Sequence, residues 1–165
     1  NSLMLVTVYM PAYNYGSYIE EAIESVINQT CKSWELIIIN DGSTDNTKDI
    51  LKKYSENVNI RVINQENKGL NVSNNIGLRL ARGKYIMRLD ADDYLDSNAI
   101  HILSDALENN PEADLSFPDY YEVDPDGNIL NLIRRNKLNK DSLLDMPAHG
   151  ACTLYRTKIL KSLGG

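Results

Sequence analysis

The sequence has 165 residues, of which 42% are hydrophobic, and this length and composition suffice for one compact domain with a single core. The formal net charge is -6, with acidic and basic residues mixed along the chain, which argues against nucleic acid or an anionic membrane as the main partner. A protein of this charge that handles a phosphate-bearing ligand needs a local source of positive charge, and a divalent cation is one such source.

Cysteine usage and the absence of targeting signals indicate the compartment. Cys31 and Cys152 lie far apart and fit neither a disulfide framework nor a zinc site. The first residues lack the basic segment and cleavage site of a signal peptide, and no apolar run approaches the ~18 residues that cross a bilayer. We therefore expect a soluble, cytoplasmic polypeptide, with attachment to the inner face of the membrane through regions outside this chain as the alternative.

Strand and helix patterns alternate over the first two thirds of the chain. Apolar residues recur at helical spacing from Ile19 to Ile27, and Ser17 with Glu20 offers a capping box for that helix. The predicted strands are residues 3–10, 36–39, 60–63 and 84–89, and the helical patterns cover residues 19–27, 50–54, 72–80 and 99–107. Four βα repeats predict an α/β fold, with a mainly parallel sheet, right-handed crossovers and helices on both faces.

The pattern changes after Pro111. Residues 115–123 and 129–133 flank the turn-forming stretch 124–127 and predict a hairpin. A short helix from Lys140, a strand over 151–155 and a helix near Lys158 are expected to follow. One α/β domain over residues 1–165, with a mixed C-terminal third, fits this sequence best.

Polar residues cluster where the predicted strands end. Ligands of open parallel sheets bind beyond the carboxyl ends of the strands, so these clusters are the candidate binding residues. They are Pro11–Asn14, Asn40–Asp45, Asn64–Gly69 and Asp90–Asp93. All four are expected to lie along one edge of the sheet.

Asp90 and Asp92 are the strongest chemical signal. Carboxylates two residues apart on an extended chain can face the same way and hold a hard cation such as Mg²⁺ or Mn²⁺. The structural alternative is helix capping, a task that Asp96 or Ser97 fits better than Asp90. The position of the pair directly after a buried strand favours the metal interpretation.

Other candidates have structural alternatives, which are favoured for Asp41 and Lys68 when each residue is considered alone. Asp41 could accept a hydrogen bond from a base or simply form a turn, Gly42 and Gly69 could be turn glycines, and Lys68 could bind phosphate or solvent. Neither GxGxxG nor GxxxxGK[ST] occurs, so the sequence supports neither a Rossmann dinucleotide site nor a P-loop. His101 and His149 are isolated and are assigned structural roles.

The motifs together resemble a known family. The succession PAYNYGSYIEEAIESVINQT, WELIIINDGSTDNT and NKGLNVSNNIGLRLARGKYIMRLDADD is similar in order, spacing and identity to the family 2 glycosyltransferases, which have the GT-A fold. The resemblance is strong over Val6–Tyr94, and HGACTLYRTKILKSLGG resembles a later segment more weakly.

The resemblance implies roles for individual residues. Asp41 would accept a hydrogen bond from the base, most often uracil, Asp92 would coordinate a divalent metal on the donor diphosphate, and Asp90 would lie near the ribose or the same metal. Asn74 replaces an arginine that is common in the family, and Lys68 would compensate for it. The implied donor-binding residues are Pro11, Ala12, Tyr13, Asn14, Asp41, Lys68, Gly69, Asn75, Asp90, Ala91 and Asp92, with Gly77 at a further matching position.

The implied activity is metal-dependent, inverting transfer of a hexose or N-acetylhexosamine from a nucleotide sugar, most often a UDP-sugar, to a glycan or lipid-linked acceptor. Residues 3–94 would bind the nucleotide and residues 95–165 would face the acceptor. The family's general base lies beyond Gly165, so we expect a truncated domain, and Asp119, Glu122 and Asp124 are assigned to the acceptor side or to the turn.

The alternatives are a nucleotidyltransferase, which should show a glycine-rich basic loop after the first strand, and a non-catalytic nucleotide-sugar-binding fragment.

Overall fold

The computed structural model describes residues 3–134 and 152–164. The predicted helix from Lys140 and His149 lie outside these residues. The elements are β1 (Val6–Ala12), α1 (Ile19–Ile27), β2 (Trp34–Asp41), α2 (Thr47–Leu51), the 3-10 helix η1 (Lys52–Tyr54), β3 (Ile60–Gln65), α3 (Leu70–Leu80), β4 (Tyr85–Arg88), α4 (Ala99–Glu108), β5 (Leu115–Ser116), β6 (Tyr120–Val123), β7 (Ile129–Ile133), β8 (Leu154–Arg156) and α5 (Thr157–Ser162).

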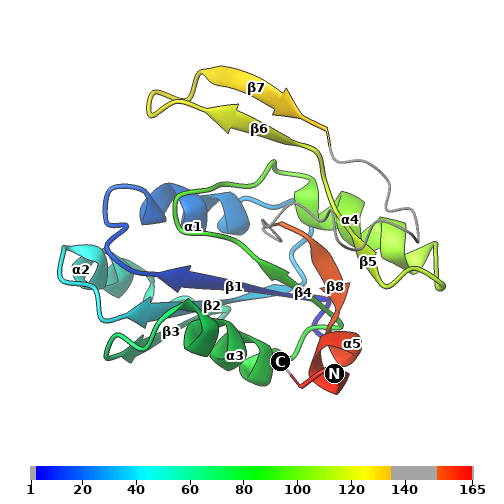
Figure 1. Ribbon diagram of the computed structural model, residues 1–165, viewed down its shortest axis with the longest axis horizontal. Coiled ribbons are helices and arrows are strands. Elements are labelled where there is room, and N and C mark those ends of the chain that lie inside the picture. The colour runs from blue at the N-terminus through cyan, green and yellow to red at the C-terminus, as the bar shows by residue number, and fades with distance from the viewer. Residues whose placement is uncertain (1–2, 135–151, 165) are drawn as a thin grey trace.

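The main sheet has six strands in the order β3-β2-β1-β4-β8-β5, and β6 and β7 form a separate hairpin. The first four strands along the chain are parallel to one another, whereas β8 pairs antiparallel with both β4 and β5. Helices α1 and α4 lie on one face of the sheet, with the hairpin beyond them, and α3 and α5 lie on the other face (Figure 1). The predicted α/β class, with a mainly parallel sheet covered on both faces, is confirmed.

Burial patterns explain the central elements. All eight residues of β2 are buried because the strand lies between β1 and β3 and is covered on both faces. Helix α1 buries Ile19, Ala22, Ile23 and Val26, the spacing of one helical face. None of the helices in the described part of the chain combines the length and the apolar character that a membrane span requires.

The start of α1 corrects one expectation. The helix begins at Ile19, as predicted, but its N-cap is Tyr18 and no side chain caps it, so the Ser17–Glu20 capping box is wrong. Backbone hydrogen bonds satisfy the start of the helix instead, because the Tyr18 and Ile19 N–H groups both donate to the Tyr15 carbonyl at 2.9 Å.

The C-terminal third differs from the expected simple hairpin. The stretch predicted as one strand over 115–123 divides into β5, which joins the main sheet beside β8, and β6, which pairs with β7. Pro118 lies between the two strands and has no N–H group to continue a ladder. The predicted strand over 151–155 is observed as β8, and the helix near Lys158 is observed as α5.

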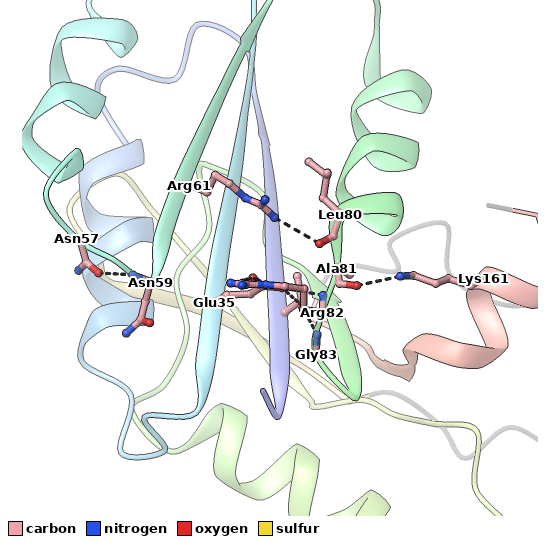
Figure 2. A network of polar contacts seen from close by, with 10 residues as sticks. Glu35, Asn57, Asn59, Arg61, Leu80, Ala81, Arg82, Gly83 and Lys161 are labelled. Atoms are coloured by element: carbon pink, nitrogen blue, oxygen red, sulfur yellow. Dashed lines mark hydrogen bonds and ion pairs between the residues drawn. The ribbon is translucent and has the colours of Figure 1, made fainter. Parts of the chain in front are cut away.

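A buried carboxylate anchors the sheet at the edge opposite the polar clusters. Glu35, at the start of β2, accepts hydrogen bonds from the Thr7 hydroxyl at 2.7 Å and from the N–H and Nε of Arg82, both at 2.8 Å. The Gly83 N–H donates in turn to the Thr7 hydroxyl oxygen at 2.9 Å. Figure 2 shows Arg82, from the segment that leads into β4, bonded to Glu35, with Gly83 next to it, and Lys161 of α5 reaching the Ala81 carbonyl.

These contacts also set the ionisation of Glu35. Burial alone would raise its pKa, but the hydrogen bonds from Thr7 and Arg82 and the Arg82 charge outweigh burial and hold the pKa below its ordinary value. The network therefore favours the charged carboxylate, which joins β1, β2 and the entry to β4.

Replacing Glu35 by Gln should lower the free energy of unfolding by about 1–3 kcal/mol at pH 7, because an amide nitrogen cannot accept the bonds from Thr7 and Arg82. A depressed folded pKa means that the stabilisation is fully present above the unfolded pKa of about 4.3 and is lost as pH falls through the folded pKa. Urea unfolding of both proteins at pH 7, and at a series of values below about pH 4.3 at which both stay folded, should show the difference shrinking.

Asp49→Asn is the matched control. Asp49 pairs with Lys52 at 2.8 Å, but both side chains are largely exposed, so its loss should leave the free energy of unfolding unchanged. Equal losses in the two variants, or a Glu35→Gln loss that does not shrink in acid, would show that the buried network does not stabilise the fold as described.

Candidate functional site

The polar residues at the carboxyl ends of the parallel strands form one continuous edge. The strands β1, β2 and β3 extend two residues further than predicted, so Pro11, Ala12 and Asp41 lie inside strands rather than after them. Ala12 lies level with Asn40, and Asn40 with Asn64. The Asn40 amide nitrogen donates to the Asn64 side-chain oxygen at 2.9 Å, which ties the ends of β2 and β3 together.

Pro11 explains where the sheet opens. Strands β1 and β4 pair as far as Tyr9 and Arg88, and the Leu89 N–H then donates to the Tyr9 carbonyl at 3.0 Å. The next bond of a parallel ladder would run from residue 11 to the Leu89 carbonyl, and proline has no N–H to make it. The chains after Pro11 and Leu89 are therefore free to diverge between β1 and β4, where the direction of the strand order reverses and α/β sheets bind ligands.

Asn14 joins the loops that follow β1 and β2. Its φ of 59° lies in the left-handed region, which asparagine tolerates better than most residues. Its side-chain oxygen accepts a hydrogen bond from the Thr44 N–H at 2.7 Å, and its own N–H donates to the Ser43 hydroxyl at 3.1 Å. Asn14 thus fixes the loop that carries the exposed Tyr13.

Asp41 shapes the loop that follows β3. The carboxylate is buried and accepts hydrogen bonds from the Gln65 amide at 2.8 Å, the Lys68 N–H at 2.7 Å and the Gly69 N–H at 2.9 Å. Burial would raise the pKa of Asp41, but the Lys68, Gln65 and Gly69 hydrogen bonds outweigh it and hold the pKa below its ordinary value. A carboxylate has about four lone-pair sites, so these three bonds leave capacity for one further donor.

Gly42 and Gly69 allow this loop arrangement. Gly42 has φ 75°, and a Cβ there would lie 2.7 Å from the Asn67 backbone nitrogen, so the residue is required for close approach of the two loops. Gly69, with φ 89°, is the N-cap of α3. Lys68 contributes its backbone to Asp41, while its side chain is exposed.

Asp90, Asp92 and Asp93 form an acidic cluster at the end of β4. One carboxylate oxygen from each lies within 4.8 Å of the others. Asp90 is half-buried and Asp92 and Asp93 are exposed, while Ala91 between them is buried in the core. The chain is not extended here, as the spacing argument assumed. It turns after Asp90, with the Asp93 N–H donating to the Asp90 carbonyl at 3.0 Å, and the three carboxylates are neighbours within this turn.

Arg88 and two tyrosines surround the cluster. Arg88 Nε lies 3.0 Å from Asp90 Oδ1, an ion-pair distance without the alignment of a hydrogen bond. The Asp92 carboxylate, with smaller effects from burial and from Asp90, raises the pKa of Tyr15. Burial, partly opposed by Arg88 and assisted by Asp90, raises the pKa of Tyr9. The effect of Asp92 on Tyr15 reflects a negative potential beside the cluster, which is the sign that attracts a cation.

The two predicted residues of helix α3 differ in their surroundings. Asn75 is exposed on the helix, and no hydrogen bond to its side chain is found among the described residues. Gly77 instead packs on the sheet, since a Cβ there would lie 2.6 Å from the Tyr9 ring. The role of Gly77 in this structure is therefore close packing of α3 on β1.

Sequence reasoning missed Tyr15, Arg88 and the contact of Gln65 with Asp41, although Gln65 lies within the Asn64–Gly69 cluster. Arg88 had a signal, because it is a charged residue in an otherwise apolar strand, two positions before Asp90 and hence on the same face. Gln65 and Tyr15 had none, since each meets its partner through folding across 24 residues or more.

The family model described as glycosyl transferase family 2 matches residues 7–164. A chondroitin synthase of Escherichia coli is 38% identical over 128 residues, which are 77% of this chain and 19% of that protein. A hyaluronan synthase of Pasteurella multocida is 35% identical over 131 residues, or 79% of this chain and 14% of that protein. The chain thus spans about one fifth or less of the length of these relatives.

Solved structures share the fold. S. aureus TarS 1-349 in complex with UDP-GlcNAc matches with a TM-score of 0.78 at 23% identity, over 98% of this chain and 48% of that one. The mannosyltransferase PcManGT from Pyrobaculum calidifontis, in complex with GDP-Man and Mn²⁺, matches with a TM-score of 0.71 at 20% identity, over 97% of this chain and 46% of that one.

The Asp41 network makes a testable prediction about the loop at residues 66–69. In Asp41→Asn the amide can accept at one atom only, so at least one of the donors from Gln65, Lys68 and Gly69 loses its partner, at a cost of about 1–3 kcal/mol. Hydrogen exchange followed by mass spectrometry should show faster exchange at residues 66–69, while exchange within β1 is unchanged.

Asp105→Asn, an exposed change on α4, serves as the control and should leave exchange at residues 66–69 as in the unmodified protein. If Asp41→Asn gave the same exchange pattern as this control, Asp41 would not be what orders the loop.

Proposed function

The chain belongs to glycosyl transferase family 2, and on this premise we propose that it carries the donor site of an enzyme that transfers a sugar from a UDP-sugar to a glycan or lipid-linked acceptor. The transferred group is a hexose or N-acetylhexosamine, the reaction inverts the anomeric centre, and a divalent cation assists it. The observation that carries the proposal is the Asp90–Asp92–Asp93 cluster beside the opening between β1 and β4.

The fold is of the GT-A type, as the resemblance implied. The choice of a uridine nucleotide is supported by structures of one similar protein with UDP and with UDP-GlcNAc. The names of the curated relatives, which are synthases of glycans and glycosyltransferases, support a transferase rather than a nucleotidyltransferase. We assign residues 3–94 to the donor and residues 95–165 to the acceptor side.

The acidic cluster fits a divalent cation. Three carboxylates within 4.8 Å offer only oxygen ligands, the type that Mg²⁺ and Mn²⁺ prefer, and two of them are exposed. Asp92 is the principal ligand in this proposal, because no hydrogen bond or ion pair to its carboxylate is found among the described residues, whereas Arg88 lies beside Asp90. A bound cation would offset the negative charge that develops on the departing nucleoside diphosphate.

The other strand ends hold the nucleotide. Asp41 has remaining acceptor capacity for a base N–H, and its bonds to Lys68 and Gly69 set the loop from which the Lys68 ammonium group can approach the diphosphate. Pro11–Asn14 form the opposite wall, braced by the bonds between Asn14 and Thr44. Donor binding in this proposal rests on loops that the protein has already ordered, which lowers the entropic cost of binding.

A general base must also accept the proton of the acceptor hydroxyl. Asp124 does not suit this role, since its carboxylate accepts bonds from the Asp126 N–H at 3.0 Å and from the N–H and side-chain amide of Asn128 at 2.8 and 2.9 Å. It forms the β6–β7 turn, as the sequence indicated. We propose that the base lies beyond residue 165 in the full-length protein.

Calorimetric titration of the full-length protein with UDP, with and without Mn²⁺, tests the donor site. We expect Mn²⁺ to strengthen UDP binding. Asp92→Asn removes a direct metal ligand, so the factor by which Mn²⁺ strengthens UDP binding should be about tenfold smaller, or more, in this variant. Asp105→Asn, which leaves the cluster intact, should bind as the unmodified protein does.

Two results would contradict the proposal. If the folded protein bound UDP equally strongly without Mn²⁺, or if Mn²⁺ strengthened UDP binding in Asp92→Asn as much as in the unmodified protein, the cation would have no part in donor binding at this site. Failure of the folded protein to bind UDP at all would remove the donor assignment.

A further inference from the structure

A cleft of about 340 Å³ lies beside Asp92 on the face of the sheet that α1 covers. Three segments that are far apart in the sequence line it. Tyr18 and Glu21 come from the start of α1, Asp92 and Tyr94 from the loop after β4, and residues 123–127 from the β6–β7 turn. The fold brings this turn near the acidic loop, and Asp92 is the one lining residue that also belongs to the proposed donor site.

The cleft has the lining that a saccharide requires. Tyr18 and Tyr94 are 45% and 43% exposed, so each presents much of a ring to solvent at the cleft. A flat ring can pack against the apolar C–H face of a sugar, while carboxylates accept hydrogen bonds from its hydroxyl groups. Glu21 is exposed on α1, and Asp126 is exposed in the turn.

The charge of the cleft selects among saccharides. Four of its lining residues are carboxylates, namely Glu21, Asp92, Asp124 and Asp126, and none of its described lining residues is basic. A cleft lined by charges of one sign focuses its field and repels ligands of that sign. A uronate, sulfate or phosphate group is therefore disfavoured here, and a neutral or amino sugar is favoured.

The position of the cleft separates it from the donor. A nucleoside diphosphate carries several negative charges, and the proposed cation lies only at the Asp92 end of the cleft. The rest of the described lining has no basic side chain and keeps the carboxylates of Glu21, Asp124 and Asp126. The hydroxyl that attacks the donor sugar must approach from outside the diphosphate site, and this cleft begins at Asp92 and continues toward the hairpin.

We propose that this cleft binds the acceptor as a neutral or amino saccharide, with Tyr18 and Tyr94 packing against its sugar rings. The inference rests on the proposed transferase function. It adds the class of acceptor and the residues that hold it, and it extends the acceptor side to Tyr18, Glu21 and Tyr94, which lie within residues 3–94. The turn set by Asp124 and Asn128 gives the cleft its outer wall.

The test uses the full-length protein, saturated with UDP and Mn²⁺, on an array of neutral, amino, uronate-bearing and sulfated oligosaccharides. We expect binding to neutral or amino members. Tyr18→Ala and Tyr94→Ala should each weaken that binding about tenfold, with unchanged affinity for UDP. Tyr121→Ala, which changes a more exposed tyrosine on β6 outside the cleft lining, should bind as the unmodified protein does.

Glu21→Gln adds a readout of charge. Removing this carboxylate should raise binding of uronate-bearing oligosaccharides relative to neutral ones, without changing the affinity for UDP. Tyrosine variants that fail to fold, as judged by circular dichroism, would be replaced by Tyr18→Leu and Tyr94→Leu, which keep apolar volume and lose the flat ring.

The outcomes separate the two proposals. If UDP binds but the bound oligosaccharides are uronates or sulfates, or none is bound, the acceptor inference is wrong and the donor site stands. Tyrosine changes that weaken binding of UDP-GlcNAc and leave oligosaccharide binding intact would assign the cleft to the donor sugar instead. Absence of UDP binding in the unmodified folded protein would overturn the proposed function itself.

Discussion

The parallel pairing of β1 with β2 on one side and with β4 on the other is the constraint on which the rest of the structure depends. It brings the carboxyl ends of the strands to one edge, so that polar residues from distant parts of the chain become neighbours. Pro11 then ends the β1–β4 ladder one bond early, because it has no N–H. The resulting divergence lies between the Asn14 loop and the acidic cluster.

Side-chain oxygens turn this edge into an ordered site. Asn14 joins the first two loops, and Asp41 binds the backbone of the third at Lys68 and Gly69. Each oxygen satisfies backbone N–H groups that no strand or helix could pair, and this lowers the cost of holding loops in one conformation. Asp92 and the Lys68 side chain remain exposed at this edge, and our proposal assigns both to the donor.

The opposite edge of the sheet is held by charge rather than by apolar packing alone. Glu35 joins β1, β2 and the entry to β4 through Thr7 and Arg82. Because β4 is short, the point at which it enters the sheet determines where it ends, and so where Asp90 lies. A structural network at one edge and a candidate binding site at the other are therefore connected through a single strand.

The sequence by itself determined the order and type of the elements up to α4, since apolar periodicity reports burial, and it indicated that Asp90 and Asp92 follow a buried strand. It also indicated the turn at Asp124. It did not determine the partners of Asp41, the division of residues 115–123 around Pro118, or the packing role of Gly77. Only the tertiary structure decided these, together with the cleft between Tyr18, Tyr94 and the hairpin turn. The physical reason is that each depends on contacts between segments far apart along the chain, whose positions are set by how strands and helices pack rather than by any local pattern.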